Sequence, residues 1–320
     1  MSQHWTLGQM PSQTGKRFLI TGANSGIGYA AAKELARSGA TVVLACRDRA
    51  RGEESLRRLR VDAEGPRSAA AEAELVELDL ASLASVRKVA AEELGRNTPL
   101  HGLINNAGVF APPQRLETQD GFELQFGTNV LGHFALTCLL MPSILLASGA
   151  REKDRPRIVT VASIAHKRAR INFDDLLSRE RYLPREAYGQ SKLANLMFSF
   201  ELERRLRRQM LGAMSVAVHP GVAKTNLFKV GSGTGVSRVF EKLISTAVGL
   251  AMNSDADGAL PTLYAATADG VKGGAYYGPQ GFQEVRGGDV GLARVAEQAR
   301  DEVVQRRLWE VCEEATGCTL

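Results

Sequence analysis

Short apolar runs alternate with longer stretches of helical periodicity along most of this 320-residue chain. An apolar run of about four to eight residues between turn residues is typical of a buried strand, whereas apolar positions that recur every three or four residues are typical of a helix. Strands and helices that alternate in this way favour a parallel sheet with helices on both faces. The pattern therefore predicts an α/β protein with a doubly wound parallel sheet.

The predicted elements follow one another without an internal repeat or a linker that would divide the chain. The predicted strands cover residues 17–21, 40–45, 74–80, 100–108 (including a terminal polar turn), 157–163 and 214–218, with a short last strand at 274–277. The predicted helices cover residues 26–38, 49–60, 82–93, 121–146, 187–210 and most of 290–312. We interpret residues 1–14 as an N-terminal tail, 62–73 as a surface loop and 15–320 as a single domain.

A glycine-rich turn follows the first predicted strand. Residues Thr21–Gly28 carry glycines spaced G-x-x-x-G-x-G, and a helix is predicted directly afterwards. Glycines let the backbone turn tightly and approach a ligand, while the unpaired N–H groups and positive dipole end of a helix N-terminus attract phosphate. The strand predicted at 40–45 completes a strand–helix–strand unit of the dinucleotide-binding type. The spacing differs from the usual G-x-G-x-x-G, so by itself it is equally compatible with an ordinary tight turn.

Tyr188 and Lys192 stand four residues apart on the longest predicted helix, so both side chains lie on one helical face. A phenol has an ordinary pKa of about 10, and a neighbouring ammonium group favours its ionised form. The pair would therefore bring the pKa of Tyr188 towards the range in which it exchanges protons with an alcohol or a carbonyl. Such a pair is common, and by itself it is also compatible with a tyrosine at the core edge and a solvated lysine.

Composition and charge narrow the class of protein. Apolar residues make up 44% of the chain, which is ample for a sizeable core. The net charge of +5 includes arginine clusters at 151–157 and 204–208, but we find no recognition motif that would pair them with nucleic acid. We interpret the clusters as a charged loop and a solvated helix face. Attraction of a phosphorylated cofactor, or peripheral contact with an anionic membrane surface, stays open.

The sequence predicts neither a membrane span nor a metal site. Residues 1–16 lack the apolar core of a signal peptide, and the charges within 236–252 favour an amphipathic helix over a transmembrane segment. His133 and His166 have no partner at metal-ligand spacing, and His219 is interpreted as structural. The cysteines, which have neither metal-ligand nor disulfide spacing, are Cys46, Cys138, Cys312 and Cys318. We therefore expect a cytoplasmic protein with buried, reduced thiols.

Several spaced motifs together resemble the short-chain dehydrogenase/reductase superfamily. In chain order they are Thr21–Gly28, Asn105–Gly108, Asn129, Ser163, Tyr188, Lys192 and Pro220–Gly221. Within the superfamily the chain is most similar to the retinol-dehydrogenase-like branch. That similarity rests on Leu44–Asp48, Ala187–Asn195, Val218–Val222 and Arg307–Trp309. The resemblance covers nearly the whole chain and implies a Rossmann-type fold. It also implies an enzyme that transfers hydride between a nicotinamide cofactor and a carbonyl or alcohol.

The resemblance further implies roles for individual residues. Tyr188 would be the general acid in carbonyl reduction, Lys192 would lower its pKa and bind the nicotinamide ribose, and Ser163 would hold the substrate oxygen. Asn129 would anchor a water that relays protons to Lys192. The implied cofactor-binding residues are Gly22, Asn24, Ser25, Gly26, Ile27, Gly28, Arg47, Asp79, Leu80, Asn106, Ala107, Gly108, Tyr188, Lys192, Pro220, Gly221 and Thr225.

The interval from Ser163 to Tyr188 is long for the superfamily, although the retinol-dehydrogenase-like branch has a similar insertion. Ser191 is therefore an alternative to Ser163. Its direction on the helix differs from that of Tyr188, so we interpret Ser191 as a helix-surface serine and keep Ser163.

The residues after the second strand bear on the choice of cofactor. A carboxylate at this point usually binds the ribose 2′-hydroxyl of NAD, whereas an arginine accommodates the 2′-phosphate of NADP. The chain has Arg47 followed by Asp48. The planar guanidinium of Arg47 suits a phosphate, which predicts NADP, while Asp48 keeps NAD as the less favoured alternative.

The substrate and the assembly are less closely defined. Apolar positions between 227 and 252 predict a substrate lid over residues 226–258 or, equally well, an amphipathic helix on the core. We expect a fairly large, apolar carbonyl or alcohol, and retinoid-like aldehydes are implied by resemblance alone. The alternatives are a reductase of a lipid, polyketide or xenobiotic ketone, and a non-catalytic nucleotide sensor. The long helices of relatives leave a homodimer or a homotetramer open.

Overall fold

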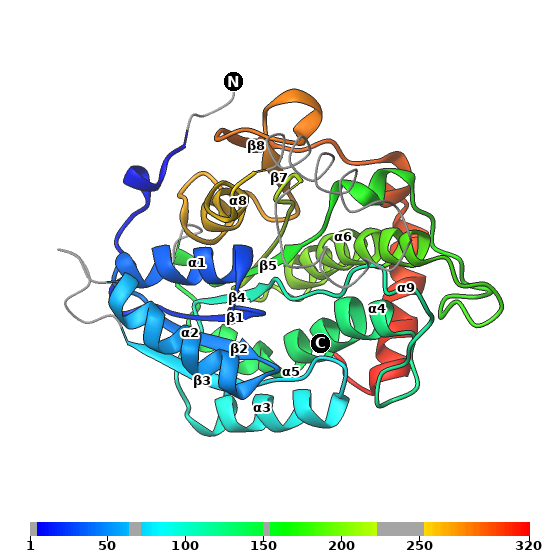
Figure 1. Ribbon diagram of the computed structural model, residues 1–320, viewed down its shortest axis with the longest axis horizontal. Helices are drawn as coiled ribbons and strands as arrows, with labels where there is room; N and C mark the ends of the chain where they lie inside the picture. The colour runs from blue at the N-terminus through cyan, green and yellow to red at the C-terminus, as the bar shows by residue number, and fades with distance from the viewer. Residues whose placement is uncertain (1–4, 64–71, 150–153, 223–252) are drawn as a thin grey trace, which may run out of the picture.

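Eight strands form one sheet among the residues that the computed structural model describes, which are 5–63, 72–149, 154–222 and 253–320 (Figure 1). The strands are β1 Arg17–Thr21, β2 Thr41–Cys46, β3 Ala73–Glu77, β4 Gly102–Asn105, β5 Arg157–Val161, β6 Met214–Val218, β7 Tyr276–Pro279 and β8 Val290–Leu292. Their order across the sheet is β3-β2-β1-β4-β5-β6-β7-β8. All neighbouring pairs are parallel except β7 and β8, which confirms the Rossmann-type sheet.

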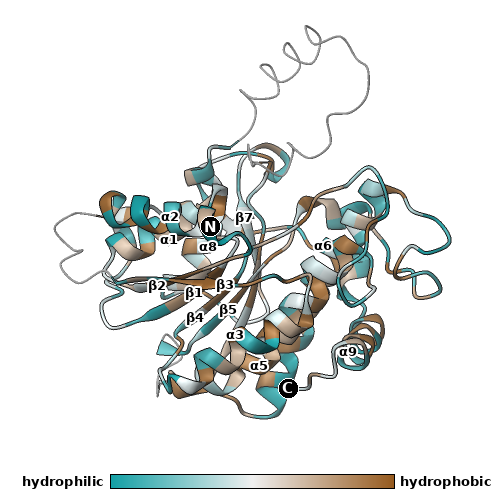
Figure 2. Ribbon diagram, turned by 60° about the horizontal axis from the view of Figure 1, so that its bottom comes forward, coloured by the Kyte–Doolittle hydropathy of each residue, from teal (hydrophilic) through white to brown (hydrophobic). Residues whose placement is uncertain are grey.

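Helices cover both faces of this sheet. The helices are α1 Gly26–Arg37, α2 Arg49–Asp62, α3 Leu83–Gly95, α4 Leu124–Phe126, α5 Gly132–Leu146, α6 Pro184–Arg208, α8 Asp255–Thr267 and α9 Glu302–Thr316. Figure 2 shows α1, α2 and α8 on one side of the sheet and α3, α5 and α9 on the other. A central strand must therefore be apolar on both faces. In β1, Leu19 packs into one hydrophobic cluster while Phe18 and Ile20 pack into the other.

Most predicted element positions are confirmed, one is wrong, and one helix has no counterpart among the predicted elements. The strands at 17–21 and 214–218 have the predicted bounds. Residues 290–292 form the edge strand β8, not the start of a helix, because the chain turns back after β7 and pairs with it in antiparallel fashion. The helix α8 at 255–267 was not predicted, since Gly258 and Pro261 interrupt its pattern.

The N-terminal residues pack onto the fold. Trp5 and Met10 are buried in the cluster that contains α1 and α8, and the ring of Trp5 meets Tyr264 edge-on at 5.6 Å. Two further predictions concern residues that the structure does not describe. These residues are Thr225 and positions 226–252 of the predicted lid at 226–258.

One helical stretch in the described part of the chain is long and apolar enough to cross a membrane. It covers Leu124–Leu146 with a mean hydropathy of 1.7, and 78% of its apolar window is buried inside the protein. It packs against α3 beneath the sheet. We therefore describe it as a core helix of this fold.

Candidate active site

The glycine turn lies at the carboxyl end of β1, where α1 begins. Gly22 and Gly26 have φ angles of 67° and 60°, in the left-handed region that favours glycine. A Cβ on Gly28 would lie 2.5 Å from Asn106 Nδ2 and 2.5 Å from the backbone oxygen of Gly22. Ser25 stands at the N-cap of α1, but its side chain makes no capping hydrogen bond. The turn thus presents closely packed backbone at the N-terminus of a helix.

Hydrogen bonds join this turn to the end of β4. Thr21 Oγ1 accepts from the backbone N–H groups of Asn106 and Ala107, both at 2.9 Å. Asn106 Nδ2 donates to the Thr21 carbonyl at 2.8 Å. His133 Nε2 lies 2.9 Å from Thr21 Oγ1, and burial lowers the pKa of His133 to about 4. This histidine is therefore a neutral, structural residue at neutral pH.

The residues that follow β2 and β3 have separate environments. Arg47 is exposed directly after β2, and it has no ion-pair or hydrogen-bond partner among the described residues. Asp48 Oδ1 instead accepts from Arg51 N at 3.0 Å as the N-cap of α2. After β3, Asp79 Oδ1 accepts from the backbone of residue 81, and the side chain of Leu80 is buried in the core.

Ser163 and Tyr188 are brought together at the carboxyl end of β5. Their side chains lie close enough for Ser163 to lower the pKa of Tyr188 through hydrogen bonding, although 24 residues separate them in the sequence. Ser163 Oγ also accepts from Ala165 N at 3.2 Å, at the start of the short helix η4 (Ile164–Arg168). The Tyr188 ring meets Phe110 edge-on at 4.7 Å. The long interval between Ser163 and Tyr188 therefore does not separate the two side chains.

Lys192 is buried one turn further along α6. Its Nζ donates to the Val161 carbonyl at 2.9 Å and lies 5.8 Å from the centroid of the Tyr188 ring. A Cβ on Gly108 would lie 3.6 Å from this Nζ and 3.3 Å from Asn129 Oδ1, so the ends of β4, β5 and the Asn129 segment converge here.

The predicted lowering of the Tyr188 pKa by Lys192 is not seen in the structure. Burial raises the pKa of Tyr188 to about 12, and the hydrogen bond with Ser163 opposes this rise. Burial also lowers the pKa of Lys192 to about 8. The ammonium group donates to the Val161 carbonyl, and desolvation is the largest influence on both pKa values.

Asn129 lies in a π-helical turn, Gly127–Leu131, of the kind often found at functional sites. Its Oδ1 accepts from Val109 N at 2.7 Å, while its Nδ2 donates to Val109 O at 3.1 Å and to Ser191 Oγ at 3.0 Å. Ser191 Oγ donates in turn to the Tyr188 carbonyl at 2.8 Å. The prediction of a surface serine is therefore wrong: Ser191 is fully buried because other elements pack around α6 on several sides.

The Pro220–Gly221 turn is held by residues that the sequence did not single out. Gly221 has a φ of 71°, and a Cβ there would lie 2.4 Å from the Val285 carbonyl. Asn253 Nδ2 donates to the Pro220 carbonyl at 3.0 Å. No motif predicts these contacts, because each joins segments more than 30 residues apart.

Glu284 connects the same region to the segment after Ser163. It is buried, it has a φ of 60°, and its Oε2 lies 2.6 Å from Lys167 Nζ on η4. Its Oε1 accepts from Arg294 N at 2.7 Å. His219 Nε2 lies 3.8 Å from the carboxylate and has no hydrogen-bond partner among the described residues. Burial lowers the pKa of His219 to about 3, so this histidine stays neutral.

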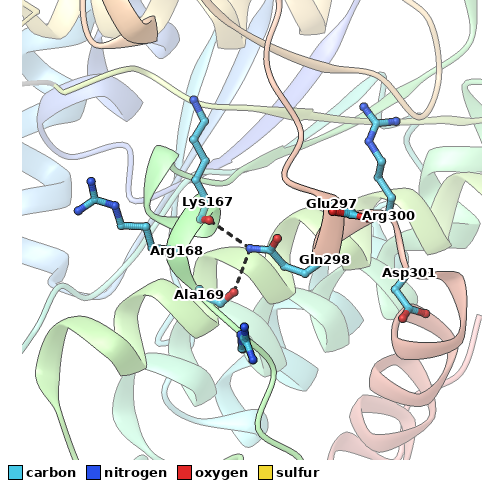
Figure 3. Close-up of a pocket in the computed structure, with 8 residues that line it drawn as sticks. Lys167, Arg168, Ala169, Glu297, Gln298, Arg300 and Asp301 are labelled. Carbon is cyan, nitrogen blue, oxygen red and sulfur yellow. Dashed lines mark hydrogen bonds between the residues drawn. The ribbon is translucent and has the colours of Figure 1, made fainter.

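A groove of about 850 Å³ lies between η4 and η7 (Glu297–Arg300). Its lining consists of Lys167, Arg168, Ala169, Arg170, Glu297, Gln298, Arg300 and Asp301. Gln298 Nε2 donates to the carbonyls of Lys167 and Ala169 and so joins its two walls (Figure 3). Figure 3 shows the guanidinium groups of Arg168 and Arg300 pointing apart, so these two arginines do not converge on one ligand.

The fold and the residues at the carboxyl ends of β1, β4 and β5 define a class of protein, the dinucleotide-dependent oxidoreductases. A sequence profile of the short chain dehydrogenase family matches residues 16–232. Human retinol dehydrogenase 14 is 42% identical over 313 residues, which cover 95% of this chain and 87% of the relative. Mouse polyprenol dehydrogenase is 39% identical over 302 residues, covering 94% of this chain and 83% of the relative.

A solved structure of an uncharacterized protein from Mycobacterium paratuberculosis has a similar fold. It has 39% sequence identity and a TM-score of 0.76, and the match covers 98% of both chains. The chain belongs to the short-chain dehydrogenase family, in its retinol-dehydrogenase-like branch. It is an NAD(P)-dependent oxidoreductase that acts on CH–OH groups of a small-molecule substrate.

Proposed function

We propose that this chain is an NADP-dependent enzyme that interconverts an apolar alcohol and its aldehyde or ketone. The observation that carries the proposal is the group formed by Ser163, Tyr188 and Lys192 at the carboxyl end of β5, next to the glycine turn. A non-catalytic nucleotide sensor would have no need of a serine–tyrosine hydrogen bond beside a buried lysine.

The proposed chemistry divides the work among these residues. Tyr188 stays protonated at neutral pH, since its pKa is about 12, and gives its proton to the substrate oxygen during carbonyl reduction. Ser163 donates a hydrogen bond to that oxygen and stabilises its developing negative charge. The cofactor, when bound, supplies the hydride. Lys192 binds the nicotinamide ribose and, through a water held by Asn129, returns a proton to Tyr188.

The glycine turn fits a dinucleotide. A side chain on Gly28 would meet backbone and amide atoms at 2.5 Å, so the close packing that lets a pyrophosphate reach the α1 N-terminus requires glycine there. We propose contacts from Gly22, Asn24, Ser25, Gly26 and Ile27 to the pyrophosphate. The adenosine half would lie against Asp79, Leu80, Asn106, Ala107 and Gly108, and the nicotinamide against Pro220 and Gly221.

The preference for NADP rests on Arg47. Its exposed guanidinium has no partner in the described part of the chain, whereas Asp48 already caps α2 and lies 3.5 Å from Arg51. Arg47 therefore offers a cation to a 2′-phosphate, whereas the Asp48 carboxylate, which would bind the ribose 2′-hydroxyl of NAD, already interacts with Arg51.

The apolar substrate is supported by two relatives whose names specify apolar alcohols, retinol and polyprenol. We also propose that residues 15–320 form one domain, since a single sheet runs through their described parts. A cytoplasmic location is supported by the four cysteines, which are all free and buried.

A carbonyl panel assayed with NADPH and with NADH tests the activity. Tyr188→Phe keeps the ring against Phe110 but removes the proton donor, so we expect kcat to fall by about 10²–10⁴-fold. Tyr277→Phe is the matched control, since that hydroxyl accepts from Lys272 N and its ring packs in the cluster on the α8 face of the sheet. Parent-like turnover by Tyr188→Phe would refute the mechanism.

Arg47→Asp tests the cofactor preference. We expect the ratio of NADPH to NADH affinity to fall at least tenfold, because the substitution replaces a phosphate-binding cation with an anion (about 1.4 kcal/mol per tenfold). An unchanged ratio would show that the 2′-phosphate is recognised elsewhere.

A further inference from the structure

Asp255 lies beside the glycine turn although it comes from a distant part of the chain. Its Oδ1 is 3.9 Å from the point that a Cβ on Gly26 would occupy. Gly26 is the first residue of α1 and Asp255 is the first residue of α8, and these two helices lie side by side on one face of the sheet (Figure 1). The positive ends of two helix dipoles therefore meet at the turn that we propose to bind pyrophosphate.

One carboxylate oxygen of Asp255 is buried without a hydrogen bond to any described residue. This oxygen is Oδ1, and burial raises the pKa of the side chain. The capping of α8 does not use it, since Ser254 Oγ accepts from Asp257 N at 3.1 Å and donates to Asp257 Oδ2 at 2.8 Å. An unpaired buried carboxylate oxygen is costly, and the helix N-termini supply a positive potential that offsets part of this cost.

The backbone before Asp255 is fixed to the opposite end of the proposed cofactor site. Asn253 N donates to Val222 O at 2.8 Å, and Asn253 Nδ2 donates to Pro220 O at 3.0 Å. Asn253 Oδ1 accepts from Gly287 N at 3.3 Å. The segment 253–255 therefore runs from the Pro220–Gly221 turn to the glycine turn, and its anchors limit how far Asp255 can withdraw.

We propose that Asp255 weakens dinucleotide binding by holding a negative charge where the pyrophosphate approaches the α1 N-terminus. The inference rests on the proposed function. Two like charges in a partly buried site repel more strongly than in water. The pyrophosphate is common to NADPH and NADH, so Asp255 acts on both and leaves the choice between them to Arg47. Such a residue speeds the release of spent cofactor, a step that limits turnover in many enzymes.

Equilibrium titration of the purified protein with NADPH and NADH, followed by dinucleotide fluorescence, tests this proposal without any turnover. We expect Asp255→Asn and Asp255→Ala each to lower both Kd values at least fivefold and to slow dissociation in stopped flow. Asp257→Asn removes the same formal charge from the same helical turn, but its carboxylate is exposed and paired with Ser254. We expect that control to change Kd less than twofold.

The direction of the expected effect separates it from damage to the fold, because a destabilised protein does not bind its ligand more tightly. Parent-like or weaker binding by Asp255→Asn and Asp255→Ala overturns the proposal. Tightening by the asparagine variant alone also overturns it, since that result indicates a new hydrogen bond and not relief of repulsion. If the parent binds neither dinucleotide, the proposed function fails and this inference fails with it. If the parent binds but neither variant tightens, only the inference fails.

Discussion

Replacement of Ser191 by alanine removes a hydroxyl that links α6 to the turn carrying Asn129. Ser191 Oγ donates to the Tyr188 carbonyl at 2.8 Å and accepts from Asn129 Nδ2 at 3.0 Å, and the side chain is fully buried. A hydrogen bond of this kind contributes about 1 kcal/mol net. Asn129 Nδ2 keeps its bond to Val109 O, so the loss is partly compensated. We therefore expect Ser191→Ala to lower the free energy of unfolding by about 1–2 kcal/mol.

Thermal unfolding and steady-state kinetics measure the two consequences. A loss of about 1–2 kcal/mol corresponds to a fall in Tm of about 1.5–3 °C for a domain of this size, at about 2.1 cal/mol/K of unfolding entropy per residue. We also expect kcat to fall severalfold, because Asn129 loses one of the contacts that fix it near Lys192. Ser12→Ala is the control, since Ser12 is exposed and bonds only to its neighbourhood in sequence. If Ser191→Ala unfolds and turns over like Ser12→Ala, the link between Ser191 and the site is refuted.

Two further predictions concern buried charges. Glu284→Gln should lower the free energy of unfolding by about 1 kcal/mol, because the half-exposed Lys167 loses its partner at 2.6 Å. It should also raise the KM for the dinucleotide, because Glu284 precedes Val285, whose carbonyl packs against Gly221 in the proposed nicotinamide site. The exposed Glu297→Gln is the control, and an unchanged KM for Glu284→Gln would contradict the role of this contact. Burial lowers the pKa of Lys192 to about 8, so between pH 8 and about 10 this residue binds more protons in the unfolded chain and contributes a rise with pH to the free energy of unfolding. The buried thiols of Cys46, Cys138 and Cys312, whose pKa values burial raises, contribute a fall in the upper part of the same window. Urea unfolding across that window should give a more positive slope of the unfolding free energy against pH in the parent than in Lys192→Met; equal slopes would contradict this contribution of Lys192.

The sequence predicted the elements whose signal is local. β1 and β6 each carry a short, mainly apolar run bounded by turn residues, so their ends could be placed to the residue. β8 has three residues and exists because β7 offers it an edge, which is information that no window of sequence contains. α8 contains Gly258 and Pro261, and its burial against α1 outweighs the poor helix propensity of these two residues.

The candidate site divides in the same way. The spacing of Tyr188 and Lys192 predicts that they share a helix face, and the glycine pattern predicts the turn after β1. The spacing predicts a surface position for Ser191, because direction on a helix does not reveal how many elements surround that helix. Asn253 and Glu284 act through partners far away in sequence, so their contacts could be found only in the folded chain.

Burial changes which group of the site is ready to exchange protons. The expectation from spacing was that Lys192 would make Tyr188 acidic, yet desolvation acts on both groups and moves their pKa values in opposite directions. At neutral pH Tyr188 therefore holds its proton firmly, while Lys192, with a pKa of about 8, is the group near its titration range. Catalysis favours a proton-exchanging group whose pKa lies near the working pH. In the proposed mechanism, Tyr188 is therefore the proton donor and Lys192 the group that exchanges protons. Asn129 and Ser191, which are hydrogen-bonded to each other near Lys192, are the residues through which that mechanism predicts proton supply to be perturbed.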